Sequence, residues 1–424
     1  MELKEAWVQE DRVFDNPLLK ITLNGLKYYG ILLYRSQRFK KLHCFRGVFF
    51  TTTLLLFNLT QYVDLVRVWG NVSEMTANAA TTLLFTTIVV RIFHFYINRA
   101  KFNTAIRHAD EGIRRIMDHG NLVEKAFLWG NVNYMNRLTA AFWICALVTA
   151  NTMCVFSLVQ YLTADVSDTV GIGNSTQLDS SVLILRSWYP AENLMDHYVT
   201  IYTIQLYIIY VGQLIVPCWH VFMVSLMVYV RTALMILNYK LSHLERYEPS
   251  GVRSGCVRRS APKDLALEKN DRRRELMVEC IQEQRRIFKF TLELESLTGG
   301  AVFMDFVVFS VLLCALLFEA SVTDSSVQIF IDICYIMTMS AILFLYYWHA
   351  NEIHFQANLL SKSAFMSDWF VYPRSVNRHL LTFICCSIKP WKMKAVIVPM
   401  SLDTFIAILR ASYSYFTILK QSAG

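Results

Sequence analysis

The sequence predicts an all-α membrane protein with seven transmembrane helices, a cytoplasmic N-terminus, an extracellular C-terminus and cytoplasmic helix extensions. Three observations predict this class: 54% of its 424 residues are hydrophobic, the apolar residues gather in seven long runs, and Lys and Arg avoid every second loop. Because roughly 20 helical residues cross a hydrocarbon core, each run is long enough to form a transmembrane helix. The runs cover 47–66, 77–96, 138–162, 198–230, 299–320, 327–349 and 396–418.

The distribution of basic residues predicts the orientation. Nine Lys or Arg precede the first run and seven lie between the second and third, whereas 67–76 holds only Arg67 and 163–197 holds only Arg186. Basic loops remain on the cytoplasmic side of a membrane. The N-terminus is therefore inside, and an odd number of crossings puts the C-terminus outside. This orientation is the reverse of that of a G-protein-coupled receptor.

Composition and motifs disfavour several other classes. The net charge of +8 follows from the loop bias and does not indicate nucleic-acid binding. His349 and His354 are five residues apart, which is not the spacing of a helical zinc site, and the sequence has no glycine-rich phosphate loop. The sequence shows no inverted repeat, which disfavours a secondary transporter. We therefore expect no catalytic residue, no metal and no cofactor.

Two glycosylation motifs agree with this orientation. Asn71 and Asn174 each begin an acceptor tripeptide, and both lie in loops that the charge pattern places outside. A third acceptor, Asn58, lies within the first run and is expected to remain unmodified. None of the ten cysteines lies in an outside loop, so no disulfide framework is predicted.

The runs divide the chain into four parts. Residues 1–46 form a cytoplasmic amphipathic segment, and 47–349 form a six-helix bundle with a ligand pocket and cytoplasmic extensions. Residues 350–395 form a cytoplasmic anchor segment, and 396–424 form the last helix with a short outer tail.

Local patterns predict further helices and a kink. Asn16 and Pro17 form a helix start, followed by an amphipathic stretch that lies either in the membrane interface or under the bundle. Pro217 predicts a kink in the fourth run. Residues 271–298 form a long helix leading into the fifth run, after a flexible polar stretch at 254–269. We expect this basic helix to pack in a cytoplasmic helix bundle rather than to serve as a calmodulin target.

Few ionisable side chains interrupt the apolar runs. The side chain of Arg91 is expected to extend to the membrane interface. Arg410 lies deeper, where it either pairs with Asp403 two turns away or faces a pore or a subunit interface. For His94 and His220 an interfacial or packing role is favoured over a catalytic one.

The last run carries a motif. The segment from Ser401 to Leu419, above all Ser-Tyr-Ser-Tyr-Phe-Thr at 412–417, resembles the C-terminal signature of insect odorant receptors. Within that family the ending is most like that of the moth sex-pheromone receptors. The chain lacks the extended second cytoplasmic loop of the shared co-receptor subunit, so it is similar to a tuning subunit that binds odorant.

The resemblance implies a ligand-gated, non-selective cation channel in the plasma membrane of olfactory sensory neurons. Four subunits, including the co-receptor, would surround a pore lined by the last helix of each, with cytoplasmic helices as the main subunit contact. Alignment on the Tyr-Phe pair places the gate at Ile418, a polar ring at Gln421, and Ser422 where an apolar residue is usual. Ser414 shares their small-residue face, which could instead be an ordinary packing face.

The resemblance also places an odorant pocket in the outer half of the second, third, fourth and sixth runs. Depth and direction give eleven candidate ligand contacts, any of which could instead be ordinary helix packing: Phe85, Thr86, Val89, Cys154, Ser157, Tyr202, Gln205, Ile209, Cys334, Tyr335 and Thr338. Most are apolar or aromatic, which predicts a volatile lipid-like ligand, namely a long-chain alcohol, aldehyde or acetate. The outer sequence Trp-Tyr-Pro at 188–190 forms either a lid or an interfacial aromatic belt.

Two other functions remain open at this point. A gustatory-receptor-like channel would share the architecture and respond without a co-receptor. A seven-helix G-protein-coupled receptor would require the opposite orientation.

Overall fold

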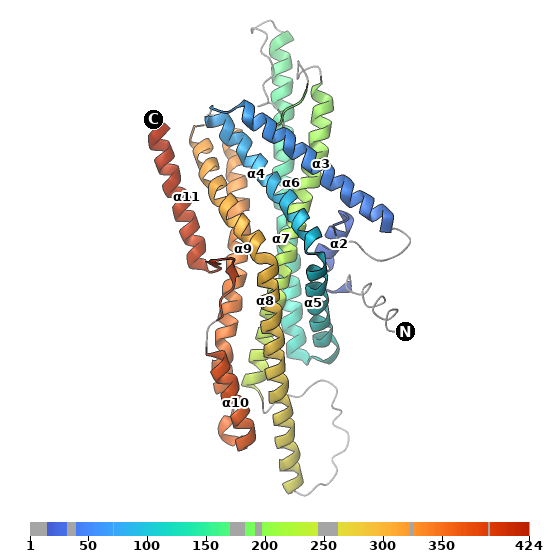
Figure 1. Ribbon diagram of the computed structural model, residues 1–424, viewed down its shortest axis with the longest axis vertical. Coiled ribbons are helices and arrows are strands. Elements are labelled where there is room, and N and C mark those ends of the chain that lie inside the picture. The colour runs from blue at the N-terminus through green and yellow to red at the C-terminus, as the bar shows by residue number, and fades with distance from the viewer. Residues whose placement is uncertain are drawn as a thin grey trace.

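The computed structural model describes residues 15–31, 40–70, 72–169, 183–190, 197–244, 262–322, 326–388 and 391–423. In this part of the chain nearly all regular structure is helical, and the long helices form one elongated bundle (Figure 1). The helices are α2 (Lys20–Tyr28), α3 (Lys40–Arg67), α4 (Val72–Ile97), α5 (Arg99–His119), α6 (Leu122–Thr169), α7 (Tyr198–Ser242), α8 (Pro262–Val322), α9 (Ser326–Phe365), the 3-10 turn η3 (Trp369–Val371), α10 (Arg374–Ser387) and α11 (Leu402–Ala423). The strands are β1 (Lys394–Ala395) and β2 (Val398–Pro399).

Six of these helices are long and apolar enough to cross a membrane, namely α3, α4, α6, α7, α8 and α9. They contain the first six predicted runs, which confirms the predicted all-α membrane fold. The seventh run corresponds to α11, which begins at Leu402 rather than at residue 396. The difference arises because β1 and β2 pair as a short antiparallel hairpin over 394–399. This hairpin separates α11 from α10.

Helix α7 is the core of the bundle. In its most apolar window 89% of the residues are buried, whereas the other five membrane helices bury 28–50%. It packs against α2, α6, α8 and α9. A helix that is apolar on all sides belongs inside a bundle, where no side faces lipid. Pro217 lies within α7, and the kink expected there stays a prediction.

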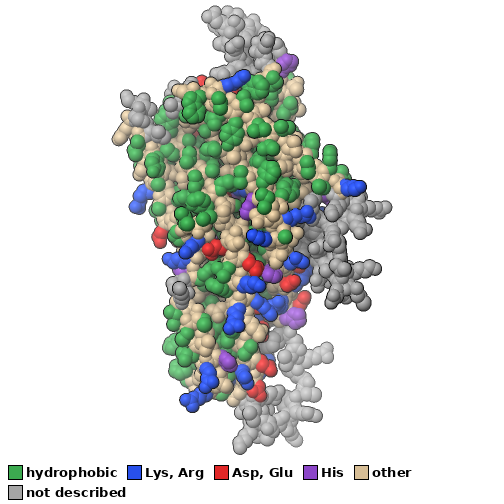
Figure 2. Space-filling view, viewed as in Figure 1, with side chains coloured by type: hydrophobic (Ala, Val, Ile, Leu, Met, Phe, Trp, Pro, Cys, Tyr) green, Lys and Arg blue, Asp and Glu red, His purple; other side chains and the backbone are tan. Residues whose placement is uncertain are grey.

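The bundle has an apolar half and a charged half. In Figure 2, hydrophobic side chains cover the upper part of the face, and Lys and Arg gather from its middle downward. The charged half contains α5, α10 and the lower parts of α8 and α9 (Figure 1). With 61 residues at about 1.5 Å each, α8 is about three times as long as a hydrocarbon core is thick. The predicted long helix is confirmed. It begins already at Pro262, within the stretch predicted to be flexible.

The N-terminal helix α2 packs under the bundle against α7. Asn16 caps the turn at 17–19 that leads into α2, since its Oδ1 accepts hydrogen bonds from the backbone N–H groups of Leu18 (3.0 Å) and Leu19 (3.3 Å); the helix itself begins three residues later than predicted, at Lys20. Leu19, Leu23 and Leu26 are fully buried. Of the two alternatives for this stretch, the structure supports packing against the bundle.

The prediction for Arg91 is wrong. Its side chain does not extend to the interface; the residue is 3% exposed and pairs with Asp305 of α8. A charged group inside a membrane bundle is stabilised by an opposite charge, and Asp305 supplies one across the helix contact. His94 and His220 both make contacts of hydrogen-bond length inside the bundle, in agreement with a packing role.

Candidate functional site

A cavity of about 270 Å³ lies between the outer ends of four helices. The N-terminal turns of α4 and α9, the C-terminal turns of α8, the outer part of α6 and residues 183–186 enclose it. Ligand pockets commonly measure about 300–1,000 Å³, so this cavity suits a compact ligand. Its apolar wall includes Ala77, Ala80, Met153, Phe156, Leu316 and Ile331.

Three polar side chains of α8 and α9 form a polar wall of the cavity, close in sequence to the apolar Leu316 and Ile331. The amide Nε2 of Gln328 donates hydrogen bonds to Asp332 Oδ1 (3.1 Å) and to Glu319 Oε1 (3.4 Å). Asp332 is 1% exposed and Glu319 is 7% exposed. The second carboxylate oxygen of Asp332, Oδ2, is buried and has no hydrogen-bond partner. This wall is therefore more polar than the mostly apolar lining predicted from the sequence.

The outer loop is held against the bundle at two points. Gln205 of α7 accepts a hydrogen bond from Leu185 N (3.1 Å) and donates one to Leu185 O (2.8 Å). On the other side, the backbone N–H of Trp188 donates to Thr60 O of α3 (3.2 Å). Residues 183–186 thereby form a fixed wall of the cavity.

A second, much smaller cavity of about 10 Å³ is lined by Phe85, Ile209 and Gly212. Tyr335 lines both cavities. Its hydroxyl donates to Met153 Sδ at 3.0 Å, which holds the ring in place between them. The side chain of Tyr335 thus separates the larger cavity from the apolar space next to it.

Four of the eleven candidate ligand contacts line one of these cavities. Ser157 and Tyr335 line the larger cavity, and Phe85, Ile209 and Tyr335 line the smaller one. The remaining seven line neither cavity in the described part of the chain: Thr86, Val89, Cys154, Tyr202, Gln205, Cys334 and Thr338. A direct ligand contact from any of the eleven stays a prediction.

Several of the seven make hydrogen bonds that serve helix packing. The hydroxyl of Tyr202 donates to Cys154 O (3.2 Å), which joins α7 to α6. Thr86 donates to the backbone of its own helix, at Thr82 O (2.8 Å). Residue direction along a predicted helix did not distinguish these packing positions from cavity positions, because both face the bundle interior.

The sequence analysis missed Glu319 and Asp332 as site residues. Both lie in or at the end of predicted apolar runs, where an ionisable residue is a signal of function by itself. Their position in these runs could therefore have identified both residues from the sequence. The small residues Ala77 and Ala80, which leave room for the cavity, carry no comparable signal.

The predicted pore positions lie on a face of α11 that its own chain does not cover. Ser414, Ile418 and Gln421 are exposed, and the side chain of Ser422 lies outside the described residues. On the opposite face, Ser412 is buried and its hydroxyl donates to Ser310 O of α8 (3.2 Å).

The alternatives for Arg410 can be compared with its position. Arg410 and Asp403 are both exposed on α11, and the ion pairs found among the described residues do not include them. The intrahelical pair is thus not formed. A pore or interface position for Arg410 stays a prediction.

The family model of the 7tm odorant receptor matches residues 71–413, which is most of the chain. This chain belongs to the insect odorant receptor family. The resemblance carried by the last helix is confirmed, and family membership places the protein among receptors rather than enzymes. The narrower likeness to moth sex-pheromone receptors stays a prediction.

Curated odorant receptors match along nearly the whole chain. Odorant receptor 56a of Drosophila melanogaster is 27% identical over 413 residues, covering 96% of both chains. Odorant receptor Or2 of Anopheles gambiae is 23% identical and covers 86% of this chain and 89% of its own.

Solved structures share the fold. The olfactory receptor OR5 of Machilis hrabei in complex with eugenol superposes with a TM-score of 0.74 at 14% identity, over 95% of this chain and 97% of that one. The same receptor described without eugenol gives a TM-score of 0.71.

Of the acceptor asparagines, Asn71 and Asn174 lie outside the described residues of this odorant receptor. Asn58 is buried in α3, and its amide donates to Thr82 O of α4 (3.0 Å). Its burial fits the expectation that it remains unmodified.

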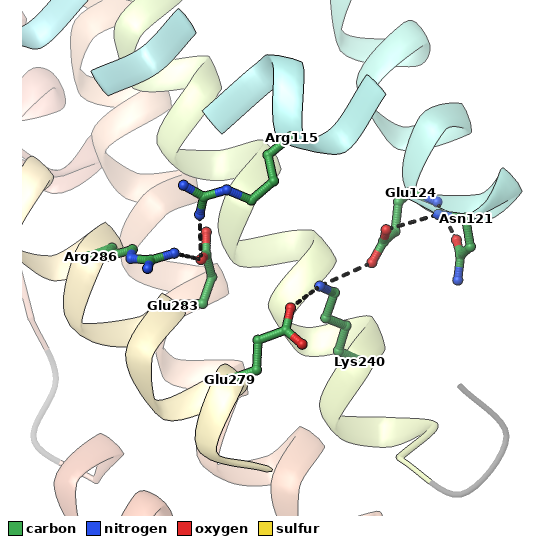
Figure 3. Close-up of polar contacts among 7 residues, drawn as sticks. All are labelled: Arg115, Asn121, Glu124, Lys240, Glu279, Glu283 and Arg286. Carbon is green, nitrogen blue, oxygen red and sulfur yellow. Dashed lines mark hydrogen bonds and ion pairs between the residues drawn. The ribbon is translucent and has the colours of Figure 1, made fainter. Parts of the chain in front are cut away.

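The charged half of the receptor contains a third cavity, of about 470 Å³ and so larger than the outer one, between α5, α6, α7 and α8. Ion pairs cross it (Figure 3). Lys240 Nζ of α7 lies 3.5 Å from Glu124 Oε1 of α6 and 3.4 Å from Glu279 Oε1 of α8. Glu283 Oε2 of α8 lies 3.4 Å from Arg115 Nη1 of α5. These pairs tie the four helices together in the half predicted to be cytoplasmic.

Proposed function

We propose that this odorant receptor is the odorant-binding subunit of a heteromeric, ligand-gated, non-selective cation channel. Its partner is the co-receptor subunit, and the complex lies in the plasma membrane of olfactory sensory neurons. The observation that supports this most directly is that α8 and α9 both line the outer cavity and both pack against α11.

The shared helices give the cavity a physical connection to α11. Glu319 of α8 lines the cavity, and Ser310 of the same helix accepts a hydrogen bond from Ser412 of α11 (3.2 Å). These two residues of α8 are about 14 Å apart along its axis at 1.5 Å per residue. On α9, the ring of Phe344 lies 5.6 Å from that of Phe405 of α11. An odorant that binds more tightly when α8 and α9 hold α11 in an open position shifts the equilibrium toward opening.

An apolar patch in the charged half supports assembly with other subunits. We define the anchor patch as Phe365, Met366, Trp369, Phe370 and Leu381, which lie between the end of α9 and α10 and are 44–71% exposed. Large exposed apolar patches outside a membrane mark protein contacts. The patch lies within the predicted anchor segment, where the subunit contact is proposed.

The ligand is a volatile lipid-like odorant, an alcohol, aldehyde or acetate with one polar end. The outer cavity supports this class, since its lining combines apolar side chains with a small group of polar ones. That a receptor of the same fold has been solved with eugenol supports a small organic ligand. With about 270 Å³ available, chain length should be discriminated.

The test is electrical recording from cells that express this chain, the co-receptor, or both, during application of the odorant classes above. We expect odorant-evoked cation currents only when both chains are present. Currents from this chain alone would instead favour a gustatory-receptor-like channel. A C-terminal tag that antibodies reach only after permeabilisation would reject the channel topology and favour a G-protein-coupled receptor.

A further inference from the structure

The carboxylate of Asp332 holds a hydrogen-bond acceptor that no described residue uses. Its Oδ1 accepts from Gln328 at 3.1 Å, but its Oδ2 has no partner although the residue is only 1% exposed. Nearly all buried polar groups in proteins have a partner, because an unpaired one has lost its hydration without compensation. Asp332 lines the outer cavity, so a molecule bound there can reach the carboxylate.

A second carboxylate reinforces the need for donors in this cavity. Glu319 is 7% exposed and lines the same wall. Both carboxylates share a single amide, because Nε2 of Gln328 donates to one oxygen of each. A carboxylate oxygen without a proton only accepts hydrogen bonds, so Oδ2 of Asp332 offers a ligand an acceptor, while the amide of Gln328 and the guanidinium of Arg186 line the same cavity as donors.

Arg186 is the other side chain that could bind the polar end of an odorant. Its guanidinium donates hydrogen bonds and would therefore suit a ligand with a carbonyl group. It lies on the loop side of the cavity and is only partly buried, unlike Asp332. Water can therefore satisfy its donors, whereas the buried carboxylate oxygen depends on the ligand. The apolar wall around Met153 and Phe156 is left for the hydrocarbon part of the ligand.

We propose that the outer cavity selects odorants whose polar end donates a hydrogen bond, an alcohol or a primary amine, with Asp332 Oδ2 as the acceptor. This inference rests on the proposed function and narrows its ligand class. A hydroxyl or an amine N–H satisfies the unpaired oxygen. An aldehyde, acetate or ether brings only lone pairs, which oppose the carboxylates, so such ligands are discriminated against.

The test compares head groups at fixed hydrocarbon length on the complete heteromer. The probes are the hexyl, octyl and decyl alcohols, primary amines, aldehydes, acetates and methyl ethers. We expect the donors to activate at concentrations about tenfold or more below those of the non-donors of equal chain length. This comparison needs no variant, so a folding defect cannot obscure it. An aldehyde, acetate or ether that matches or exceeds the alcohol and amine overturns the proposal.

Two substitutions at one position add a reciprocal test. Asp332→Asn keeps the size but introduces an amide donor, and should raise the effective alcohol concentration about tenfold while improving the aldehyde response. Asp332→Leu should abolish the preference among head groups. The control Glu293→Gln alters an exposed pair in the charged half and should change nothing. An unaltered head-group preference in both Asp332 variants overturns the proposal.

Two further outcomes separate this inference from the proposed function. Currents evoked equally by all head groups reject the donor requirement and leave the odorant-gated channel intact. Loss of preference on Arg186→Ala, but not on Asp332→Leu, assigns selection to the guanidinium and rejects Asp332 as the acceptor. Labelling of intact cells shows whether the heteromer reaches the cell surface. If it does and no probe evokes a current, the result counts against both the donor requirement and the proposed function.

Discussion

The guanidinium of Arg91 on α4 pairs with the carboxylate of Asp305 on α8 inside the membrane half of the bundle. The two residues are 3% and 1% exposed. The contact uses one guanidinium nitrogen and one carboxylate oxygen, because Arg91 Nε and Asp305 Oδ2 have no hydrogen-bond partner. This pair fixes α4 relative to α8, the helix that also contacts α11 and the outer cavity.

Removing one member of this pair should destabilise the receptor strongly. Arg91→Met leaves the Asp305 carboxylate buried without a counter-charge, a change that destabilises folded proteins by about 3–5 kcal/mol. The double variant Arg91→Met, Asp305→Leu replaces both charges by apolar groups and should regain most of the loss. Thermal unfolding of the purified complex in detergent measures both. A double variant as unstable as the single one would show that the ion pair itself is needed.

Gln205 should control odorant sensitivity through the loop rather than by contact with the ligand. Gln205→Leu leaves the buried N–H of Leu185 without a partner and its C=O with only the hydroxyl of Ser187, at about 1–3 kcal/mol, and loosens the wall of the cavity. We expect the half-maximal odorant concentration to rise about tenfold with unchanged single-channel conductance. Thr203→Val is the control, because this exposed residue bonds only within its own helix, to Val199 O. Unchanged sensitivity in Gln205→Leu would show that the loop closes without this contact.

The position of the helices could be predicted from the sequence because their signals are local. Apolar runs and basic loops reflect the thickness of the membrane and the sign of its inner side, so α3, α4, α6, α7, α8 and α9 fall where the runs lie. The cavity could not be predicted in this way. Asp332 and Gln205 both sit on interior helix faces, and only the packing of α4, α6, α8 and α9 decides that Asp332 lines a space and Gln205 holds a loop. The partner of Arg91 lies 214 residues away, so no local pattern identifies it.

Lys240 should stabilise the charged half of the receptor by joining α6, α7 and α8. Its ammonium is 15% exposed and lies between Glu124, 3% exposed, and Glu279. Lys240→Met removes both contacts and leaves Glu124 buried, so we expect a loss of about 1–3 kcal/mol, seen as a lower unfolding temperature. Lys289→Met serves as the control, since that lysine is 76% exposed and lies 3.9 Å from its acidic partner. Equal effects of the two substitutions would contradict a joining role for Lys240.

The anchor patch should be needed for assembly and not for folding of the single chain. Phe370 is 71% exposed, so Phe370→Ser removes little internal packing but weakens a contact between subunits. Co-purification with the tagged co-receptor should fall several-fold, while the amount of this chain in the membrane stays constant. Leu122→Ser provides the control, because Leu122 is 88% exposed at the start of α6 and does not belong to the anchor patch. Full co-purification of Phe370→Ser would place the contact elsewhere.

Tyr335 should set the longest odorant that the cavity accepts. Its ring lies between the outer cavity and the small apolar cavity beside Phe85 and Ile209. Tyr335→Ala joins the two spaces, so longer chains can bury further methylenes, each adding about 0.8 kcal/mol or a roughly fourfold gain in affinity. We expect the most potent alcohol to become longer by a few methylenes. Tyr335→Phe removes only the hydroxyl contact with Met153 and should keep the wild-type optimum. Dose–response series over chain length measure both variants, and an optimum that does not move in Tyr335→Ala would mean that the odorant lies elsewhere.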